Sequence, residues 1–408
     1  MTNLLLDGLV VLDLSRYASG PSATQLLADH GARVIKLEPP TGDPFRSEGP
    51  AEIPDGVGGY FLRFNRNKES VVCDLTAPEG IEVLLDLVRK VDVIVENFKP
   101  GFLSSRGIAY EQLSEVNPRL ILASISGFGS EDVLPSPDSG RAAFAVIAEA
   151  EGGIINRIGE PDCRPHWSGV SLGDLNAGTM TVVAILMALF RREKTGVGDH
   201  IDLAMTDVMI ALNERAILMT SLTGSEPERG QASSMVGPLP CADGYVVAGV
   251  VGRKRWAAVC DLVGGPDLVA SLGTWRGEWM DFKTNIVVPR IESWLADKTS
   301  EEAVGRLEAI GVPSGIVKNA SQVISSPHAR ARHMMVDLEY PGVGKCVAVA
   351  SPIVTLRSDR VAASGPPLLG EHTVSVLSEL LDYSPNRVDE LLHSGVIIGD
   401  STSGAGLD

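Results

Sequence analysis

Short apolar runs alternate with helical patterns along the first part of the chain. GLVVLDL, residues 8–14, is nearly continuous, as in a strand buried on both faces, and it leads through the turn SRYASGP into a helical pattern closed by Gly31. ARVIKLEPP then has the pattern of a second strand stopped by prolines. This order predicts two parallel strands joined by a helical crossover.

The alternation continues after a loop that we place at residues 39–59. SVVCDL, DVIVENF and LILASISGFG are predicted strands, with helices between them from Thr76 and over EQLSEVN. The sequence TAPE has the form of a capping box, with Glu79 three positions after Thr76. We therefore expect an α/β protein with a mostly parallel sheet covered on both faces. Ligands of such sheets bind beyond the carboxyl ends of the strands, where the turns SRYASGP, ENFKPG and SGFGS stand.

The composition changes in the second half of the chain. The polar stretch TGSEPERG, within residues 220–230, is a predicted linker, and GYVVAGVV and SEEAVGRLEAI beyond it have their own strand and helix patterns. The chain closes with a helix near VDELLHSGVI and a tail, STSGAGLD, that we expect to fray. The predicted layout is a large domain beginning with residues 1–215, a linker and small domain in 216–335, and a return to the large domain in 336–408.

Composition and charge restrict the partners. The chain has 408 residues, 44% of them hydrophobic, and a formal net charge of -17, which repels nucleic acid and anionic membranes. An anionic ligand must therefore meet a local cluster of positive groups. Five scattered cysteines without a CxxC pair predict reduced thiols and a cytoplasmic protein. We expect neither a signal peptide, since the first residues lack a basic region, nor an uncharged apolar run of membrane-spanning length.

The common cofactor and metal motifs are missing from the sequence. No GxGxxG follows the first strand and no GxxxxGK[ST] occurs, which disfavours a nicotinamide or ATP enzyme. The seven histidines form no HExxH or HxH pattern and none lies near a cysteine in finger spacing. We therefore expect no metal site.

One acid stands at the start of a long apolar helix pattern. Asp174, in SLGDLNAG, falls at the N-cap or in the first turn of this helix, where a negative charge gains roughly 0.3–1 kcal/mol. Taken alone, it is most simply a helix cap. Gly173 and Gly178, however, allow a backbone or a ligand to approach closely, and the apolar TVVAILMALF sets the helix start deep in the protein. A carboxylate held there is oriented and partly dehydrated, as a nucleophile needs.

Basic and amide side chains gather after the predicted strands. They come from three segments: FNRNKES supplies Asn65, Arg66, Asn67 and Lys68, ENFKPG supplies Asn97 and Lys99, and SSRG supplies Arg106. Singly, each is a solvated surface group. Together, on consecutive turns at one sheet edge, they suit a polyphosphate ligand.

These motifs, taken in order, resemble the class III CoA-transferase family, of the formyl-CoA transferase and carnitine CoA-transferase type. The resemblance extends from Leu5 to about Ile397 and rests on VLDLSRYASGPSATQLLADHGARVIKLEPPTGDP, NRNKESVVCDL, ENFKPGFL, NPRLILASISGFG, SLGDLNAG with ALFRREKTGVGDHIDLAM, and PPLLGEHT. It implies a large Rossmann-like parallel-sheet domain built from both chain ends, a smaller inserted α+β domain, and an interlocked homodimer.

The resemblance also implies a reaction. The family nucleophile is the aspartate of the GD motif, and only Asp174 fits it. It attacks an acyl-CoA thioester to give an anhydride and then an aspartyl-CoA thioester, and an acceptor carboxylic acid reverses the steps without a metal. Backbone N–H groups near the helix start would stabilise the oxyanions. Coenzyme A, the substrate and carrier, is implied to contact Arg16, Tyr17, Ala18, Asn67, Lys68, Asn97, Phe98 and Arg106.

Three departures from the family pattern disfavour oxalate and formate as substrates. Ala18 stands where formyl-CoA transferases often have glutamine, and Pro39 stands where a basic residue follows the IKxE strand. QASSMVGPLP replaces the glycine-rich loop of the oxalate enzymes.

Other activities of the fold stay open. The α-methylacyl-CoA racemase branch needs a histidine with its aspartate for proton exchange, but Ala143 and Phe144 stand at that place, which disfavours racemisation. Intramolecular CoA transfer within one dicarboxylic acid, an isomerase reaction, and CoA binding without catalysis are further alternatives. The sequence names neither donor nor acceptor, and a second carboxylate has Arg164, His166 or Ser234 as candidate partners.

Overall fold

The chain forms two compact units in the computed structural model, which describes residues 3–49, 58–230, 235–272, 279–340 and 343–399. The first unit comprises Met1–Gly159, Cys163–Glu226 and His333–Asp408, so both ends of the chain belong to it. The second comprises Glu160–Asp162 and Pro227–Arg332. The predicted division at residues 215 and 335 stays a prediction about domains.

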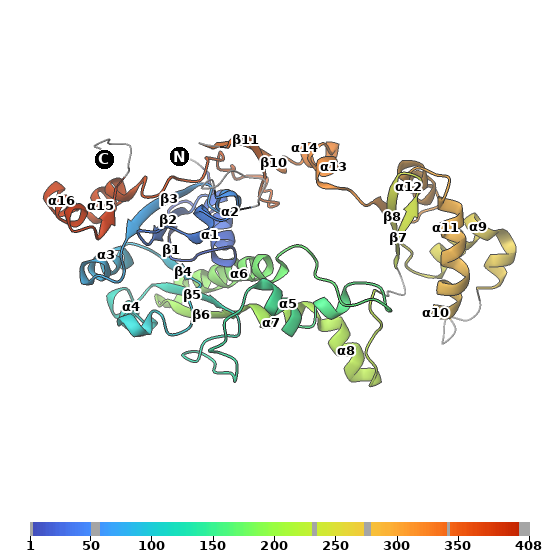
Figure 1. Cartoon of the computed structure of the whole chain (residues 1–408), viewed down its shortest axis with the longest axis horizontal. Helices are drawn as coiled ribbons and strands as arrows, with labels where there is room; N and C mark the ends of the chain where they lie inside the picture. Colours follow the sequence, from blue (N-terminus) through green and yellow to red (C-terminus); the bar gives the residue numbers. More distant parts are fainter. Residues whose placement is uncertain (1–2, 50–57, 231–234, 273–278, 341–342, 400–408) are drawn as a thin grey trace. The chain divides into compact units, whose positions relative to one another are not determined.

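A seven-stranded sheet forms the middle of the first unit (Figure 1). All neighbouring strands are parallel except the edge strand β12, which runs antiparallel to β3. The predicted α/β class and mostly parallel sheet are therefore confirmed. In spatial order the strands are β12 (Ile397–Ile398), β3 (Lys68–Cys73), β2 (Arg33–Glu38), β1 (Val10–Asp13), β4 (Val93–Glu96), β5 (Ile121–Ser126) and β6 (Asp199–Ala204).

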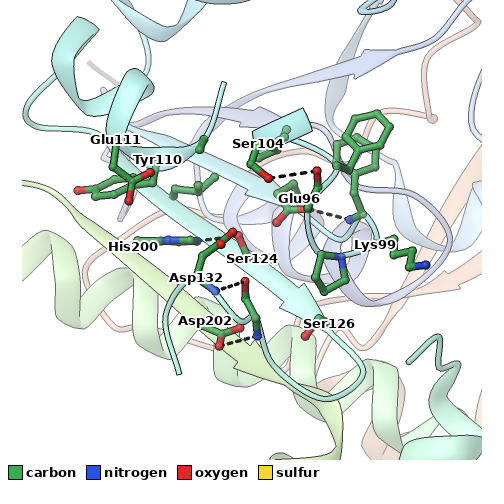
Figure 2. A pocket seen from close by; sticks show the side chains of 18 residues that line it. Glu96, Lys99, Ser104, Tyr110, Glu111, Ser124, Ser126, Asp132, His200 and Asp202 are labelled. Atoms are coloured by element: carbon green, nitrogen blue, oxygen red, sulfur yellow. Dashed lines mark hydrogen bonds between the residues drawn. The ribbon is translucent and has the colours of Figure 1, made fainter. Parts of the chain in front are cut away.

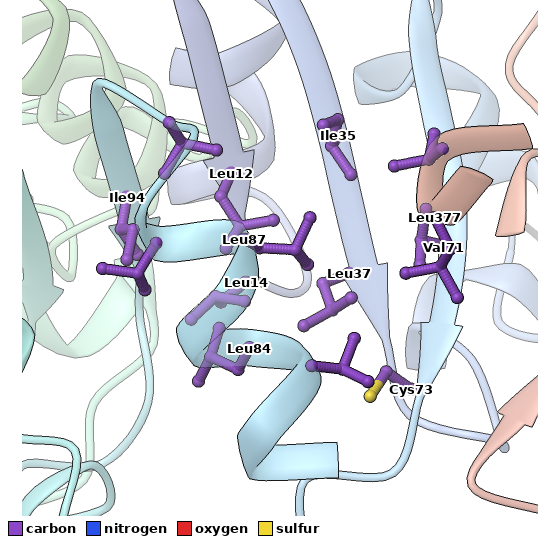
Figure 3. Packing of buried hydrophobic residues seen from close by; sticks show 14 of the residues in the cluster. Leu12, Leu14, Ile35, Leu37, Val71, Cys73, Leu84, Leu87, Ile94 and Leu377 are labelled. Atoms are coloured by element: carbon purple, nitrogen blue, oxygen red, sulfur yellow. The ribbon is translucent and has the colours of Figure 1, made fainter. Parts of the chain in front are cut away.

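Successive residues of each strand face opposite sides of the sheet. Leu12, Ile35 and Ile94 point into a core with Leu84 and Leu87 (Figure 3). The helices that cover this face are α3 (Pro78–Val88), α4 (Tyr110–Val116), α15 (Thr373–Leu381) and α16 (Pro385–His393).

The other face of the sheet has its own core, which includes Val11, Val34 and Val95. It is covered by α1 (Ser19–Asp29), α5 (Ala145–Glu151), α6 (Leu172–Thr195) and α7 (Met205–Leu212). Since each inner strand is apolar on both faces, the near-continuous apolar runs of the sequence are explained.

Helix α6 is longer and more apolar than the sequence analysis expected of any segment. Among the described residues it is the one helix with the length and composition of a membrane span, with a mean hydropathy of 1.6 over its most apolar part. Its buried residues include Ala177, Val182 and Ile185, which belong to the same apolar cluster as the strand residues Val11, Val34 and Val95. The helix is thus part of the core of the first unit.

Several local predictions were wrong for identifiable reasons. Helix α3 begins at Pro78 with no side-chain cap, because the Thr76 hydroxyl donates to Asp74 Oδ1 at 2.7 Å instead of capping the helix. The apolar pattern of TDVMIALNERAIL, residues 206–218, predicts a single helix, but the structure has two, α7 and α8 (Glu214–Thr223), which meet at Asn213.

Some elements of the first unit were not predicted. They include α5, α15, η1 (Pro44–Arg46), α2 (Gly59–Phe64), η2 (Ser104–Arg106), η3 (Ile155–Arg157) and the hairpin of β10 (Met335–Tyr340) and β11 (Gly344–Val349).

The second unit has an antiparallel three-stranded sheet with helices around Trp256, which is fully buried. Its strands are β7 (Met235–Cys241), β8 (Gly244–Gly249) and β9 (Ser314–Ile316). Its helices are α9 (Arg253–Ala270), α10 (Trp279–Phe282), η4 (Lys283–Val287), α11 (Val288–Leu295), α12 (Ser300–Ala309), α13 (Ala320–Ile324) and α14 (Pro327–Ala331).

Candidate active site

A cavity of about 290 Å³ opens at the carboxyl ends of β1, β4 and β5 in the first unit. The three turns named from the sequence all line it, through Tyr17, Asn97 and Ser126. Asp174, at the start of α6, lines it as well. The strand order reverses between β1 and β4, which is where ligands bind in open parallel sheets.

Asp174 does not cap its helix. The N-cap residue of α6 is Ser171, so Asp174 lies in the third helical position. Within the described part of the chain its carboxylate has no hydrogen bond or ion pair, and it faces the cavity. The carboxylate is therefore available to a ligand.

The pKa of Asp174 is raised to about 6. Burial is the largest cause, the charge of Glu149 adds to it, and Arg63 partly offsets both. The sequence argument expected the helix end to favour ionisation, whereas burial and the charge of Glu149 raise the pKa of Asp174. Asp174 is nonetheless mostly ionised at neutral pH.

The two glycines near Asp174 serve helix packing. A Cβ atom on Gly173 would lie 2.9 Å from the backbone of Ala145 in α5, and one on Gly178 would lie 2.8 Å from the backbone oxygen of Ser19 in α1. Both distances are shorter than real Cβ contacts, so neither position accepts a larger residue without movement. The glycines thus fix Asp174 against α5 and against the first turn of α1.

Asn97 joins the turn after β4 to the turn after β1. Its Oδ1 accepts from the Arg16 backbone N–H at 2.8 Å, and its Nδ2 donates to the Arg16 backbone oxygen at 2.7 Å and to the Ser19 hydroxyl at 3.1 Å. The predicted site residue is therefore a link between the two turns that carry the site.

Tyr17 presents an aromatic surface beside the cavity. Its backbone has φ 64°, in the left-handed region, and its N–H donates to Asp43 Oδ1 at 3.3 Å. Its ring makes edge contacts with Phe45 and Phe144, at centroid distances of 5.3 and 6.0 Å. Ala18, next in the chain, is buried as the N-cap residue of α1 and does not line this cavity.

A second cavity, of about 220 Å³, lies beside the same turns and holds two cations, Arg16 and Arg106. The Arg16 guanidinium lies 5.0 Å from the centre of the Phe98 ring, and that of Arg106 lies 3.7 Å from the centre of the Phe102 ring. Neither arginine has a carboxylate partner in the described residues. Phe98 lines both this cavity and the one with Asp174.

Asn67 and Lys68 lie away from both cavities, contrary to expectation. Asn67 donates to Asp29 at 2.9 Å and accepts from the Ser364 backbone N–H at 2.7 Å. Lys68 is buried, and its Nζ contacts Asp13 Oδ2 at 2.9 Å. Their side chains are thus committed to contacts within the protein.

Lys68 instead supports the turn after β1 from behind. Burial alone would raise the pKa of its partner Asp13, but Lys68 and Lys36 hold that pKa well below its usual range. Lys36 donates to the Ser15 backbone oxygen at 2.8 Å and pairs with Asp43 at 3.0 Å. Because Asp43 also holds Tyr17, this buried network fixes the turn that faces the cavity.

The sequence and the fold match one known family across most of the chain. The model of CoA-transferase family III matches residues 6–373. The chain belongs to CoA-transferase family III. It is accordingly a CoA-transferase.

Named relatives of this CoA-transferase act on different acids. A succinyl-CoA:mesaconate CoA-transferase from Haloarcula hispanica is 36% identical, over 94% of this chain and 98% of its own. A succinyl-CoA:glutarate CoA-transferase from Homo sapiens is 32% identical, over 96% and 90%. A CAIB/BAIF family protein from Brucella suis has a similar structure, with a TM-score of 0.81 and 32% identity over 93% of this chain and all of that chain.

A third cavity of the CoA-transferase, of about 40 Å³, was not foreseen (Figure 2). Glu96, Ser124, His200 and Asp202 point into it from β4, β5 and β6 (Figure 2). Ser124 Oγ lies 3.0 Å from His200 Nε2, and Glu96 accepts from the Phe98 backbone N–H at 2.7 Å. Burial raises the pKa of Glu96 to about 7. The sequence contained a sign of this cluster, since its polar residues stand within strands that are otherwise apolar.

Other residues singled out from the sequence have simpler positions. Ala143 lies close to Gly127, since a Cβ atom on Gly127 would be 2.5 Å from the Cβ of Ala143. Among the described residues, the lining of the Asp174 cavity includes no histidine. Arg164 and His166 are exposed and do not line that cavity, and Ser234 lies outside the described residues. The described residues hold no group of three or more potential metal ligands among His, Cys, Asp and Glu.

Proposed function

We propose that this CoA-transferase moves CoA from an acyl-CoA to an acceptor carboxylic acid through covalent intermediates on Asp174. The observation that carries the proposal is the partly buried carboxylate of Asp174, which has no hydrogen bond or ion pair within the described residues and faces its cavity. A nucleophile needs such a free, dehydrated carboxylate. The neighbouring cavity holds the cations Arg16 and Arg106.

The reaction balances without a metal or water. Asp174 attacks the thioester carbonyl, the carbon–sulfur bond breaks, and the CoA thiolate departs. The product on the enzyme is a mixed anhydride of Asp174 and the donor acid. The thiolate then attacks the Asp174 carbonyl carbon, and the donor acid leaves as a carboxylate. The acceptor carboxylate attacks the resulting aspartyl-CoA thioester and releases the thiolate. The thiolate finally takes the acceptor acyl group and restores the Asp174 carboxylate.

The arrangement supports CoA binding along the two larger cavities. Arg16 and Arg106 suit the phosphates, since a protein with a net charge of -17 must attract a polyanion locally. Phe98, shared by both cavities, suits the pantetheine arm on its way to Asp174. The proposed contacts of CoA are therefore Arg16, Tyr17, Phe98 and Arg106, with Asn97 fixing the turns.

Stabilisation of the oxyanions is less simple than the sequence suggested. Near the start of α6, the N–H groups of Leu172, Gly173 and Leu175 already donate to other groups.

The proposed enzyme is a homodimer. Met187, Phe190, Leu212, Leu218 and Leu222, on α6, α7 and α8, are each exposed by half or more. Apolar surface of this kind on neighbouring helices is typical of a protein interface. A second copy of the chain is the partner that the family resemblance implies, and the interlocked arrangement belongs to the same proposal.

The experiment is a transfer assay with acyl-CoA donors against a panel of mono- and dicarboxylic acids. We expect transfer to a separate acid, loss of activity in Asp174→Ala on the order of 10³-fold or more, and donor-dependent inactivation by hydroxylamine. Full activity of Asp174→Ala would contradict the mechanism. CoA moving within one dicarboxylic acid, with no separate acceptor needed, would instead make the enzyme an isomerase.

A further inference from the structure

Glu149 is a carboxylate that the reaction does not use, although it lies beside the nucleophile. Its residue is fully buried in α5, and among the described residues it has no cation partner. Its Oε1 accepts from the Gly173 backbone N–H at 3.3 Å, and its Oε2 accepts from the Ser168 hydroxyl at 3.4 Å. A buried carboxylate with two long hydrogen bonds is costly, so its position requires a reason.

Helix packing fixes this position. The backbone of Ala145, one turn before Glu149 in α5, lies against Gly173, where only a glycine fits. The same contact brings the Glu149 carboxylate to the Gly173 N–H, one residue before Asp174. The start of α6 is thus capped by a side chain from another helix, which leaves the Asp174 carboxylate without a capping role.

We propose that Glu149 is a positioning residue for Asp174: it holds the start of α6 through Gly173 and faces the nucleophile with a second negative charge. This proposal rests on the proposed function, in which Asp174 is acylated. Other charged groups near Asp174 are Arg63 on α2 and, in the lining of the cavity, Lys99 and Arg141.

The charge of Glu149 has a direct consequence for the covalent intermediates. Two neighbouring carboxylates repel each other, and this repulsion raises the free energy of ionised Asp174. Acylation removes the charge of Asp174 and therefore relieves the repulsion. Glu149 thus makes Asp174 a stronger nucleophile and favours the acylated enzyme over the free one.

The test compares Glu149→Gln with Glu149→Leu in the full-length enzyme. Glu149→Gln keeps an oxygen acceptor for Gly173 but loses the charge, whereas Glu149→Leu loses both. We expect Glu149→Gln to keep its thermal stability, to move the acid limb of kcat/KM below about pH 6, and to lower the fraction of enzyme with bound aspartyl-CoA severalfold. The limb should stay above the ordinary aspartate range, because burial, the larger cause of the raised pKa, is unchanged. Glu149→Leu should lose kcat further.

Asp207→Asn, which removes an exposed carboxylate from the neighbouring helix α7, is the matched control and should leave the pH profile unchanged. An unchanged acid limb and unchanged adduct fraction in Glu149→Gln would overturn the proposal about Glu149. Failure of the proposed function gives a different result, since the wild-type enzyme would then form no adduct on Asp174 at all.

Discussion

In the proposed mechanism, protonation of Asp174 sets the pH range in which the transferase works. The proposed nucleophile must be ionised, but burial and the charge of Glu149 raise its pKa to about 6, and Arg63 offsets part of this effect. We therefore predict that kcat/KM falls roughly tenfold per pH unit below about pH 6. The measurement is kcat/KM of the first half-reaction as a function of pH, with overlapping buffers as controls. An acid limb at about pH 4 would mean that the carboxylate is solvated in the working enzyme.

The same pKa makes a prediction about stability. A carboxyl group with a raised pKa in the folded state binds more protons there than in the unfolded chain, so stability falls as pH rises from about 4 to about 6. Asp174→Asn lacks this loss and should unfold at a higher temperature than the wild type at pH 7. The two proteins should have equal unfolding temperatures only below about pH 3, where Asp174 is protonated in both the folded and the unfolded state. A lower unfolding temperature of Asp174→Asn at pH 7 would refute this reasoning.

At the residue scale, the sequence predicted the position of Asp174 in the first turn of α6, because a GD motif stands there at a helix start. Its catalytic role stays a prediction. Lys68 looked like a surface cation because a sequence does not show that Asp13, fifty-five positions earlier, is its buried partner. Glu149 was overlooked because nothing in AEAEGG distinguishes a buried acid from a solvated one.

At the scale of elements, the turn after β1 depends on the turn after β4. Asn97→Ala removes three hydrogen bonds between them, each with a net value of about 1 kcal/mol. We predict that the KM for acyl-CoA rises at least tenfold, because the Arg16 turn is no longer held.

Asn117→Ala is the matched control for this change. Asn117 also makes three hydrogen bonds to backbone groups, those of Val88, Val91 and Arg119, but it lies away from the cavities of the site. The measurement is the steady-state KM for acyl-CoA of the two variants. An equal KM in both would show that Asn97 contributes stability only.

Helices and strands were predictable where one periodic pattern of apolar residues dominates the segment. The strands β1 to β5 have apolar runs between turn residues, and each appears close to its predicted position. Helix α2 was missed because its six residues, GYFLRF, are too few to show a helical period. The end of α7 was missed because the pattern of apolar residues continues through Asn213, where the backbone leaves the helix.

At the scale of the whole molecule, exposed apolar side chains make a prediction about assembly. The double variant Met187→Glu with Phe190→Glu places two charges on α6, where both side chains are about two-thirds exposed. We expect it to shift the protein from dimer to monomer in sedimentation velocity or light scattering, because a buried unpaired charge is costly at an interface.

Leu356→Glu is the control for this experiment, since Leu356 is 98% exposed in another part of the same unit. It should leave the assembly state unchanged. A double variant with the mass of the wild type would exclude this surface from the interface.

The α/β class followed from the sequence because alternating apolar runs and helices have few other solutions. The choice of acids did not follow, since the pocket is lined by residues from five or more distant segments. The relatives show that one fold serves mesaconate and glutarate enzymes alike, so the acceptor must be found by assay.

Mass spectrometry of the peptide that contains Asp174, after incubation with acyl-CoA alone, tests the central claim most directly. The account predicts a mass increase equal to an aspartyl-CoA thioester on Asp174, which disappears when an acceptor acid is added and is absent from Asp174→Ala. An active enzyme whose Asp174 peptide stays unmodified, or a CoA adduct on another residue, would contradict it.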